Sequence, residues 1–314
     1  MRAVRATGEG GVGVVQVDLT VPDHALDPVR VRVRSCGICG SDLHLAQWNI
    51  PVTLGHEFAG VLDDGTAVVV QPNVWCGACD RCRAGDTHLC RTGLSRLHGV
   101  SIDGGLADEV IVDRSCLVPL PDGIGPDIGA LVEPLAVAGH ALRRVPLESG
   151  ARILVIGGGS IGLSLVAVAR ARDIDVDLSA RYRHQHEAGE RLGARRDLLE
   201  EYDVVVDAAG TQSSLDDAVT KVRPGGTIVV AATYWDPVSF GSGLLGKEAH
   251  VVPASMYGHD HGTREFDTAA ALLAAYPEIG DVLISHRFGL DDAAEAFRLS
   301  GDRASGAIKV VLAP

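Results

Sequence analysis

The stretch Ile153-Leu-Val-Ile-Gly-Gly-Gly-Ser-Ile-Gly162 joins a short apolar run to a glycine-rich turn. The apolar run predicts a buried strand, and a helix is expected to follow from Ile161. Glycines at such a junction let the backbone approach a pyrophosphate, whose charge the helix N-terminus stabilises. A plain tight turn is the alternative, but strand before and helix after favour a dinucleotide site. The residues expected to bind the cofactor here are Gly157, Gly159, Ser160, Ile161 and Gly162.

Strand and helix patterns continue to alternate after this stretch. Further strands are expected at 174–179, 203–208 and 227–232, and the second helix is expected to end at Leu192. Repeated strand–helix units of this kind predict a parallel sheet with helices on both faces.

The first 135 or so residues follow a different pattern. Short alternating stretches at 31–34, 66–70 and 108–112 predict an antiparallel, barrel-like β domain. Ala, Leu and Val at helical spacing over 131–144 then predict a helix at or near the joint between two domains. The fold class is therefore expected to be α/β, with a β-barrel domain and a doubly wound domain.

The carboxyl-terminal end is expected to rejoin the first domain. Residues 290–299 predict a helix, and the apolar stretch 307–312 predicts a short returning strand. The expected domains are residues 1–137 with 278–314, and residues 138–277.

Composition limits the classes of function. The chain has 314 residues, 46% of them hydrophobic, and a formal net charge of -13. This charge disfavours a nucleic-acid partner, which requires a concentrated basic surface. No apolar run approaches the roughly 20 residues that span a bilayer, and MRAVRATGEG lacks the apolar stretch of a signal peptide. We therefore expect a soluble, cytoplasmic protein without a membrane partner.

Four of the seven cysteines lie close together. Cys76, Cys79, Cys82 and Cys90 have a spacing that lets one loop place four thiolates around a tetrahedral Zn²⁺. An iron–sulfur cluster is a rival because it also takes four thiolates, whereas a disulfide framework does not suit an odd number of cysteines in an intracellular chain. A site closed by four thiolates leaves no position for substrate, so its expected role is structural.

A second group offers three ligands to a metal. Cys39 is followed after a short interval by His56 and Glu57. A thiolate, an imidazole and a carboxylate leave one position open on a tetrahedral ion, which is typical of catalytic zinc. Taken singly, the three residues also fit a buried cysteine, a surface histidine and a solvated glutamate.

Together these motifs resemble the zinc-containing medium-chain dehydrogenases. They are Cys39-Gly-Ser-Asp-Leu-His44, Gly55-His56-Glu57, the four-cysteine segment and the glycine-rich turn, in that order. The stretch Leu131-Val-Glu-Pro-Leu-Ala136 is similar to the polyol branch, which includes sorbitol, threonine and glucose dehydrogenases. The resemblance implies a GroES-like barrel, a Rossmann domain and two zinc ions per chain. It also implies a homodimer or homotetramer.

The resemblance assigns roles to individual residues. It makes Cys39 and His56 direct zinc ligands, and it makes Glu57 and Glu133 ligands directly or through water. Asp42 would orient His56. Two further residues, Ser41 and His44, would pass the substrate's proton through the cofactor ribose towards solvent.

The implied reaction is hydride transfer between an alcohol or ketone and a nicotinamide cofactor, with a polyol, cyclitol, sugar or simple secondary alcohol as substrate. Two rivals share the fold: a zinc-stapled binding protein without chemistry, and zinc-free quinone-reductase relatives, which should lack these metal ligands. The segments 60–71 and 194–203 look shorter than in the family, so loops and one helix are expected to be trimmed.

The end of the strand at 174–179 decides between NAD and NADP. An acidic residue there would bind the ribose hydroxyls, whereas a basic one would accept the extra phosphate. The in-phase position is Ala180, followed by Arg181 and Arg183, and Asp177 has the opposite parity and is expected to point away. The sequence therefore predicts a preference for NADP(H) over NAD(H), unless the two arginines are only solvated loop charges.

Overall fold

The structure, a computed structural model, describes residues 1–8, 10–148 and 150–314. It divides into two compact units, one of Met1–Glu133 with Gly258–Pro314 and one of Pro134–Tyr257. The first division lies close to the expected joint at 137, and the second lies well before the expected return at 278. The earlier return has a visible cause, because Arg264 donates hydrogen bonds to the carbonyls of Ser115 and Leu117, both at 3.2 Å.

The first unit holds most of the strands. Its regular elements are β1 (Arg2–Ala6), β2 (Val12–Gln16), β3 (Pro28–Ile38), α1 (Gly40–Gln47), β4 (Glu57–Val61), β5 (Ala67–Val70), α2 (Asp80–Arg83), β6 (Glu109–Asp113), β7 (Leu117–Pro119), β13 (His259–Asp260), β14 (Thr263–Arg264), α8 (Glu265–Ala275), α9 (Glu278–Leu283), β15 (Ile284–Gly289), α10 (Ala293–Gly301) and β16 (Lys309–Ala313). Short 3-10 turns lie between some of them, and α3 (Val132–Arg143) crosses the division between the units.

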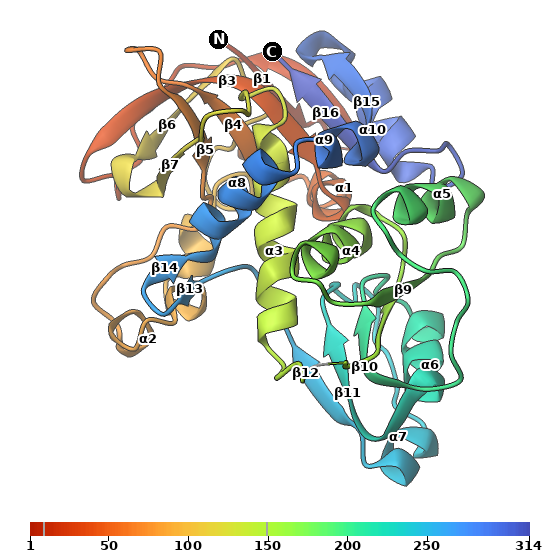
Figure 1. Ribbon diagram of the computed structural model, residues 1–314. Coiled ribbons are helices and arrows are strands. Elements are labelled where there is room, and N and C mark those ends of the chain that lie inside the picture. The colour runs from red at the N-terminus through yellow and green to blue at the C-terminus, as the bar shows by residue number, and fades with distance from the viewer. Residues whose placement is uncertain (9, 149) are drawn as a thin grey trace. The chain divides into compact units, whose positions relative to one another are not determined.

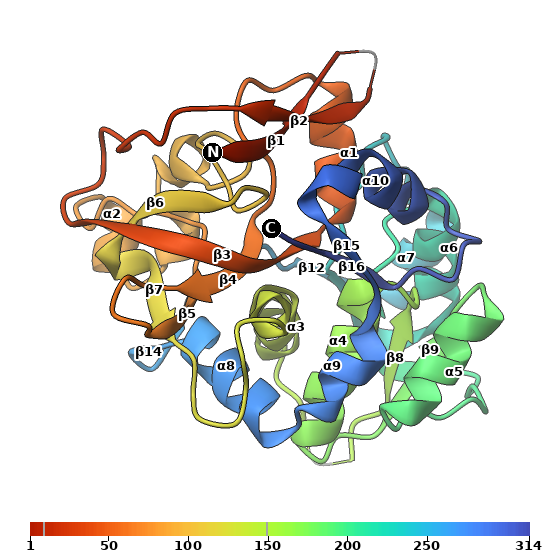
Figure 2. The same ribbon diagram turned by 90° about the horizontal axis from the view of Figure 1, so that it is seen from above.

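One mixed sheet organises this unit. Its strand order is β15-β16-β3-β4-β5-β7, and β6 pairs with β3 as well. The last strand, β16, pairs antiparallel with β3 in the register Val310 to Ile38, so the predicted return of the carboxyl-terminal strand is confirmed (Figure 2). Strand β3 also pairs antiparallel with β4, with Gly37 opposite Glu57. These two pairings bring β16 and the start of β4 to the end of β3.

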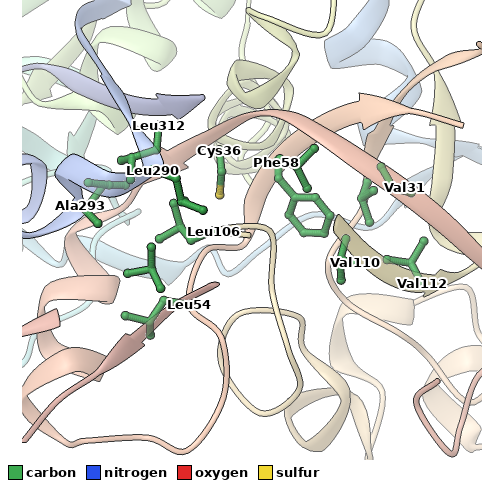
Figure 3. Packing of buried hydrophobic residues seen from close by; sticks show 14 of the residues in the cluster. Val31, Cys36, Leu54, Phe58, Leu106, Val110, Val112, Leu290, Ala293 and Leu312 are labelled. Atoms are coloured by element: carbon green, nitrogen blue, oxygen red, sulfur yellow. The ribbon is translucent and has the colours of Figure 1, made fainter. Parts of the chain in front are cut away.

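Alternating apolar residues of the strands form the core of the first unit. Val31, Phe58, Val110 and Leu312 are almost completely buried and belong to one cluster (Figure 3). Burial of each large apolar side chain contributes roughly 1.5–3 kcal/mol. The core thus joins side chains of β3, β4, β6 and β16.

The second unit is a parallel α/β sheet. Its elements after α3 are β8 (Ile153–Ile156), α4 (Ser160–Ala171), β9 (Val176–Ser179), α5 (Arg183–Arg191), β10 (Tyr202–Asp207), α6 (Gln212–Lys221), β11 (Val222–Val230), α7 (Ser242–Lys247) and β12 (His250–Pro253). The strand order is β12-β11-β10-β8-β9, every pair is parallel, and Figure 1 shows β11 between β10 and β12. The predicted doubly wound sheet is confirmed.

Chain order reverses between β8 and β10, since β9 lies on one side of β8 and β10 on the other. In open α/β sheets ligands bind outside the carboxyl ends of the strands at such a switch point. Between Ala194 and β10, all of it described, there is no helix, and only an isolated parallel bridge joins Arg195 to Asp177. Within the described ranges, none of the helices is long and apolar enough to span a lipid bilayer.

Candidate active site and metal centres

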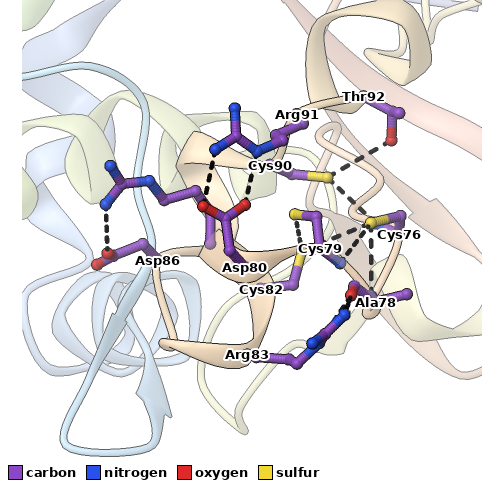
Figure 4. A network of polar contacts seen from close by, with 11 residues as sticks. Cys76, Ala78, Cys79, Asp80, Cys82, Arg83, Asp86, Cys90, Arg91 and Thr92 are labelled. Carbon is purple, nitrogen blue, oxygen red and sulfur yellow. Dashed lines mark hydrogen bonds and ion pairs between the residues drawn. The ribbon is translucent and has the colours of Figure 1, made fainter.

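The four cysteines of the loop around α2 converge on one point (Figure 4). The Sγ of Cys82 lies 3.5 Å from that of Cys79 and 3.9 Å from that of Cys76. Thiolates bound to one zinc ion at 2.3 Å in tetrahedral geometry are about 3.8 Å apart. All four are free thiols in the structure, so the donor set and its spacing fit one tetrahedral ion.

Backbone N–H groups of the loop point at these sulfurs. The N–H of Cys76 donates to the Sγ of Cys90 and that of Cys79 donates to the Sγ of Cys76, both at 3.3 Å. Donation from the backbone N–H groups of Arg91 and Cys82 lowers the pKa of Cys79 to about 6, whereas burial and the neighbouring thiols raise the pKa of Cys82 to about 12. An ion pair between Arg91 and Asp80 at 2.6 Å closes the loop.

The second metal group consists of Cys39, His56 and Glu57, whose ligand atoms all lie within 4.8 Å of one another. Cys39 directly follows β3 and His56 directly precedes β4. Because these strands are antiparallel neighbours with Gly37 opposite Glu57, the end of one and the start of the other must meet. The pairing of β3 with β4 therefore builds the site.

Asp42 connects two members of this group. It is completely buried, its Oδ2 accepts the N–H of Cys39 at 2.8 Å, and its Oδ1 lies 3.4 Å from Nδ1 of His56. With Nδ1 facing Asp42, Nε2 is the nitrogen left for a metal. Burial acts to lower the pKa of His56, but the charges of Asp42 and Cys39 outweigh it and raise the pKa well above its usual value.

Lys309 is a residue of this site that the sequence analysis did not single out. Its ammonium lies 2.7 Å from Oε1 and 2.6 Å from Oε2 of Glu57, and both side chains are almost completely buried. Burial acts to lower the pKa of Lys309, but the charge of Glu57, followed by those of Cys39 and Glu133, raises it. The available signal was one cation inside the otherwise apolar stretch 307–312.

Glu133 is buried in the first turn of α3, where a negative charge suits the positive end of the helix dipole. Its carboxylate is outside the group of three ligands that lie within 4.8 Å of one another. The negative charge of Glu133 nevertheless acts on Lys309, so the two belong to one electrostatic environment.

Ser41 and His44 lie on α1, three positions apart and therefore about one turn from each other on the same side of the helix. Both are half-buried. Since α1 begins directly after Cys39, both residues are carried by the helix that starts at the metal group.

The glycine-rich turn between β8 and α4 has the form expected of a pyrophosphate cradle. Gly157 has a φ of +108°, which L side chains rarely adopt, and a Cβ on Gly162 would collide with the carbonyl oxygen of Gly157. The Oγ of Ser160, the first residue of α4, is buried without a hydrogen-bond partner among the described residues. Together with the free N–H groups of the helix, these features fit an anionic ligand.

The end of β9 carries no exposed carboxylate. Asp177 is completely buried, and its oxygens accept hydrogen bonds from Nε of Arg195 at 2.8 Å and from the hydroxyl of Tyr202 at 2.7 Å. Its side chain is thus directed into the unit, as its parity predicts. Ala180, whose Cβ would lie 2.8 Å from a Cβ built on Gly158, lines the turn instead.

The residues after Ala180 offer exposed positive charge. Arg181 lies 5.7 Å from the ring centroid of Tyr182, and that ring stacks on His184. Arg183 forms an ion pair with Glu187 at 2.6 Å in the first turns of α5. Both arginines are solvent-exposed at the carboxyl end of β9.

Comparisons with known proteins agree with this geometry. Residues 26–122 match the family model for the alcohol dehydrogenase GroES-like domain, and residues 174–312 match the model for zinc-binding dehydrogenases. L-galactonate-5-dehydrogenase of Escherichia coli K12 is 30% identical, over 85% of this chain and 86% of its own length.

Two solved structures are similar over their full extent. A protein from Sinorhizobium meliloti described as a zinc-binding dehydrogenase, with NADP bound, has a TM-score of 0.86 and 30% identity, covering 100% of this chain and 99% of that one. Galactitol-1-phosphate dehydrogenase of Escherichia coli has a TM-score of 0.88 and 27% identity, covering 100% of both chains. Fold, metal-binding groups and glycine turn agree, and this chain belongs to the zinc-binding, medium-chain alcohol and polyol dehydrogenase family.

Proposed function

We propose that this enzyme oxidises a secondary hydroxyl of a polyol or sugar acid, or reduces the corresponding ketone, with NADP(H). The observation that carries the proposal is the convergence of Cys39, His56 and Glu57 within 4.8 Å, with Asp42 behind them. A zinc ion held there would supply a Lewis acid that lowers the pKa of an alcohol hydroxyl. A second zinc in the four-cysteine loop would hold that loop closed.

The remaining roles belong to side chains. Asp42 fixes the ring of His56 and the backbone of Cys39, which keeps the two principal ligands in place. Ser41 accepts the proton that the substrate hydroxyl releases, and His44 passes it to solvent. The Gly157–Gly162 turn holds the cofactor pyrophosphate at the start of α4.

The preference for NADP(H) is supported by the end of β9. Asp177 already accepts hydrogen bonds from Arg195 and Tyr202. Arg181 and Arg183, which follow Ala180, are exposed to solvent. An arginine there can pair with a ribose phosphate. The similar protein from Sinorhizobium meliloti was solved with NADP. The test is kcat/KM for both cofactors, and a clear advantage for NAD(H) contradicts the proposal.

The substrate class is supported by relatives named for oxidation of galactonate and galactitol phosphate. A panel of polyols, sugar acids, sugar phosphates and simple secondary alcohols, with their ketones, tests it. Faster turnover of simple alcohols than of any hydroxylated substrate would contradict it. We also propose a homodimer or homotetramer, which light scattering tests, and a reducing compartment such as the cytoplasm, where the seven free thiols persist.

The metal assignment is tested with Cys39→Ser. The wild-type chain is expected to hold two zinc ions, and the variant is expected to hold one and to lose turnover, since ligand loss removes the Lewis acid. Cys116→Ala is the matched control, because Cys116 is buried but belongs to neither metal group. Full zinc content and rate in Cys39→Ser would refute the catalytic assignment.

A further inference from the structure

Asp207, the last residue of β10, is a completely buried carboxylate that accepts hydrogen bonds on both oxygens. Its Oδ1 accepts the backbone N–H groups of Ala209 at 2.9 Å and Gly210 at 3.1 Å. Its Oδ2 accepts the hydroxyls of Tyr234 at 2.6 Å and Ser214 at 3.0 Å. An ionised carboxylate has about four acceptor sites, so these contacts fill them. One oxygen thus holds the chain directly after β10, and the other binds side chains from α6 and from the loop after β11.

The chain after β10, residues 208–210, forms one wall of the glycine-rich turn. Strand register places the end of β10 beside Ile156, the residue before Gly157. The N–H of Ala208 donates to the carbonyl of Ile156 at 2.9 Å. A Cβ on Gly157 would lie 3.0 Å from the carbonyl carbon of Ala208 and from the nitrogen of Ala209, so the two segments are in close contact. The position of this wall therefore depends on the backbone N–H groups that the buried carboxylate accepts.

Tyr234 brings the loop after β11 to the same carboxylate. Gly210 has a φ of +67°, and a Cβ there would lie 2.7 Å from the carbonyl oxygen of Thr233, so this loop packs directly on the wall. Farther along the loop, the N–H of Ser239 donates to Oε1 of Gln212 at 2.8 Å, and Nε2 of Gln212 donates to the carbonyl of Ser239 at 3.0 Å. Burial and the neighbouring carboxylate raise the pKa of the Tyr234 hydroxyl, which therefore remains a donor at neutral pH.

We propose that Tyr234 is a positioning residue for the nicotinamide cofactor: its hydroxyl orients Asp207, which holds the wall 208–210 against Gly157 before the cofactor binds. The inference rests on the proposed function, because it requires a dinucleotide in the turn between β8 and α4. A wall that is already ordered improves affinity, since binding then loses less conformational entropy. Without the hydroxyl, the carboxyl group can rotate more freely, and its hydrogen bonds to the backbone of the wall weaken.

The test compares Tyr234→Phe with wild type by calorimetric titration of NADP and of NAD. Both dissociation constants are expected to rise by about five- to tenfold, the effect of one buried hydrogen bond. The factor should be the same for both cofactors, because the wall contacts a turn that both use. At saturating cofactor, kcat should stay within about threefold of wild type. An unchanged dissociation constant in folded Tyr234→Phe, or a rise for one cofactor alone, would overturn the proposal.

Tyr202→Phe is the matched control. The Tyr202 hydroxyl also donates to a completely buried aspartate, Asp177, at 2.7 Å, but Tyr202 lies at the other end of β10 from the cofactor turn. Both variants should lose stability in urea, whereas Tyr202→Phe should bind both cofactors with dissociation constants within about twofold of wild type. Equal weakening of cofactor binding in the two variants would show a general effect of destabilisation and sink the inference.

The variant Asp207→Asn tests whether Tyr234 acts through this carboxylate. It should weaken the binding of both cofactors at least as much as Tyr234→Phe does. Adding Tyr234→Phe to it should then change the dissociation constants by less than about twofold, because the two residues act through one contact. Effects that multiply would show that Tyr234 acts by another path, against the proposal. Binding of neither cofactor to the wild-type chain would refute the proposed function, on which the inference depends.

Discussion

Replacing Asp177 with asparagine separates two interpretations of this acidic residue of β9: a structural hydrogen-bond acceptor, or the carboxylate that binds the cofactor ribose. If Asp177 is a structural acceptor, Asp177→Asn should destabilise the protein and leave cofactor preference unchanged. The carboxylate is completely buried and accepts hydrogen bonds from Tyr202 at 2.7 Å and Arg195 at 2.8 Å. The Tyr202 hydroxyl also accepts the N–H of Leu199 at 2.7 Å. An asparagine amide has one oxygen where the carboxylate has two, so it can accept from Tyr202 or from Arg195 but not from both.

The expected magnitude follows from these contacts. A buried hydrogen bond to a charged group contributes about 1.5–3 kcal/mol. The Arg195 side chain is 50% exposed, so its ion pair is screened and adds little. We therefore expect a loss of about 2 kcal/mol, because one of the two acceptor contacts is lost and the other is no longer charge-assisted. This is roughly a thirtyfold change in the unfolding equilibrium.

Urea unfolding followed by circular dichroism measures the stability, and kcat/KM with NADP and NAD gives the preference. The ratio of the two efficiencies should stay within about twofold of wild type, because nothing at the cofactor site changes. Asp175→Asn is the matched control: its ion pairs with Arg170 and Arg195 are exposed, and its cost should stay below about 0.5 kcal/mol. A tenfold shift in the ratio for Asp177→Asn at unchanged stability would refute the reasoning.

Three more predictions concern single side chains. Burial lowers the pKa of His98 to about 4, so between pH 6.5 and 4 the unfolded chain binds a proton that the folded chain excludes. Stability therefore falls as the pH drops through this window. His98→Phe should remove up to about 3 kcal/mol of this pH dependence, which urea unfolding at several pH values measures. Cys79→Ser should lose one of two zinc ions and make the four-cysteine loop susceptible to limited proteolysis, while the ion at Cys39 is retained. Loss of both ions would contradict two independent metal sites. His44→Ala should lower kcat by about 10²-fold at unchanged zinc content and respond to added imidazole, and an unaffected rate would remove His44 from the proton path.

The periodicity of apolar residues predicted the helix at the joint between the units and the strands that follow it. Helical spacing over 131–144 predicts α3, which the structure places at Val132–Arg143, and the strand–helix alternation predicts β8 to β11 within a few residues. The second boundary between the units, at Gly258, was harder to predict from the sequence. Residues from Gly258 onward belong to the first unit through contacts such as that of Arg264 with the carbonyls of Ser115 and Leu117, and backbone acceptors leave no mark in the sequence.

The direction of the Asp177 side chain in β9 was predicted from strand geometry alone. Parity along a strand fixes the face of each side chain, which is why Asp177 is correctly expected to point away from Ala180. Its partners could not be named in advance. Arg195 comes from an irregular segment and Tyr202 from a strand that is not the neighbour of β9, so only the packed structure brings them to one carboxylate.

By itself the sequence determined what depends on neighbours along the chain: the four-cysteine loop, the strand–glycine–helix turn, the thiolate that directly follows β3 and the imidazole that directly precedes β4. Local backbone geometry sets the spacing of these residues, and the residue types at these positions indicate metal binding and dinucleotide binding. Only the tertiary structure decided that Glu57 is paired with Lys309, 252 residues away, because a buried charge is placed by the docking of β16 on β3 and not by any local pattern.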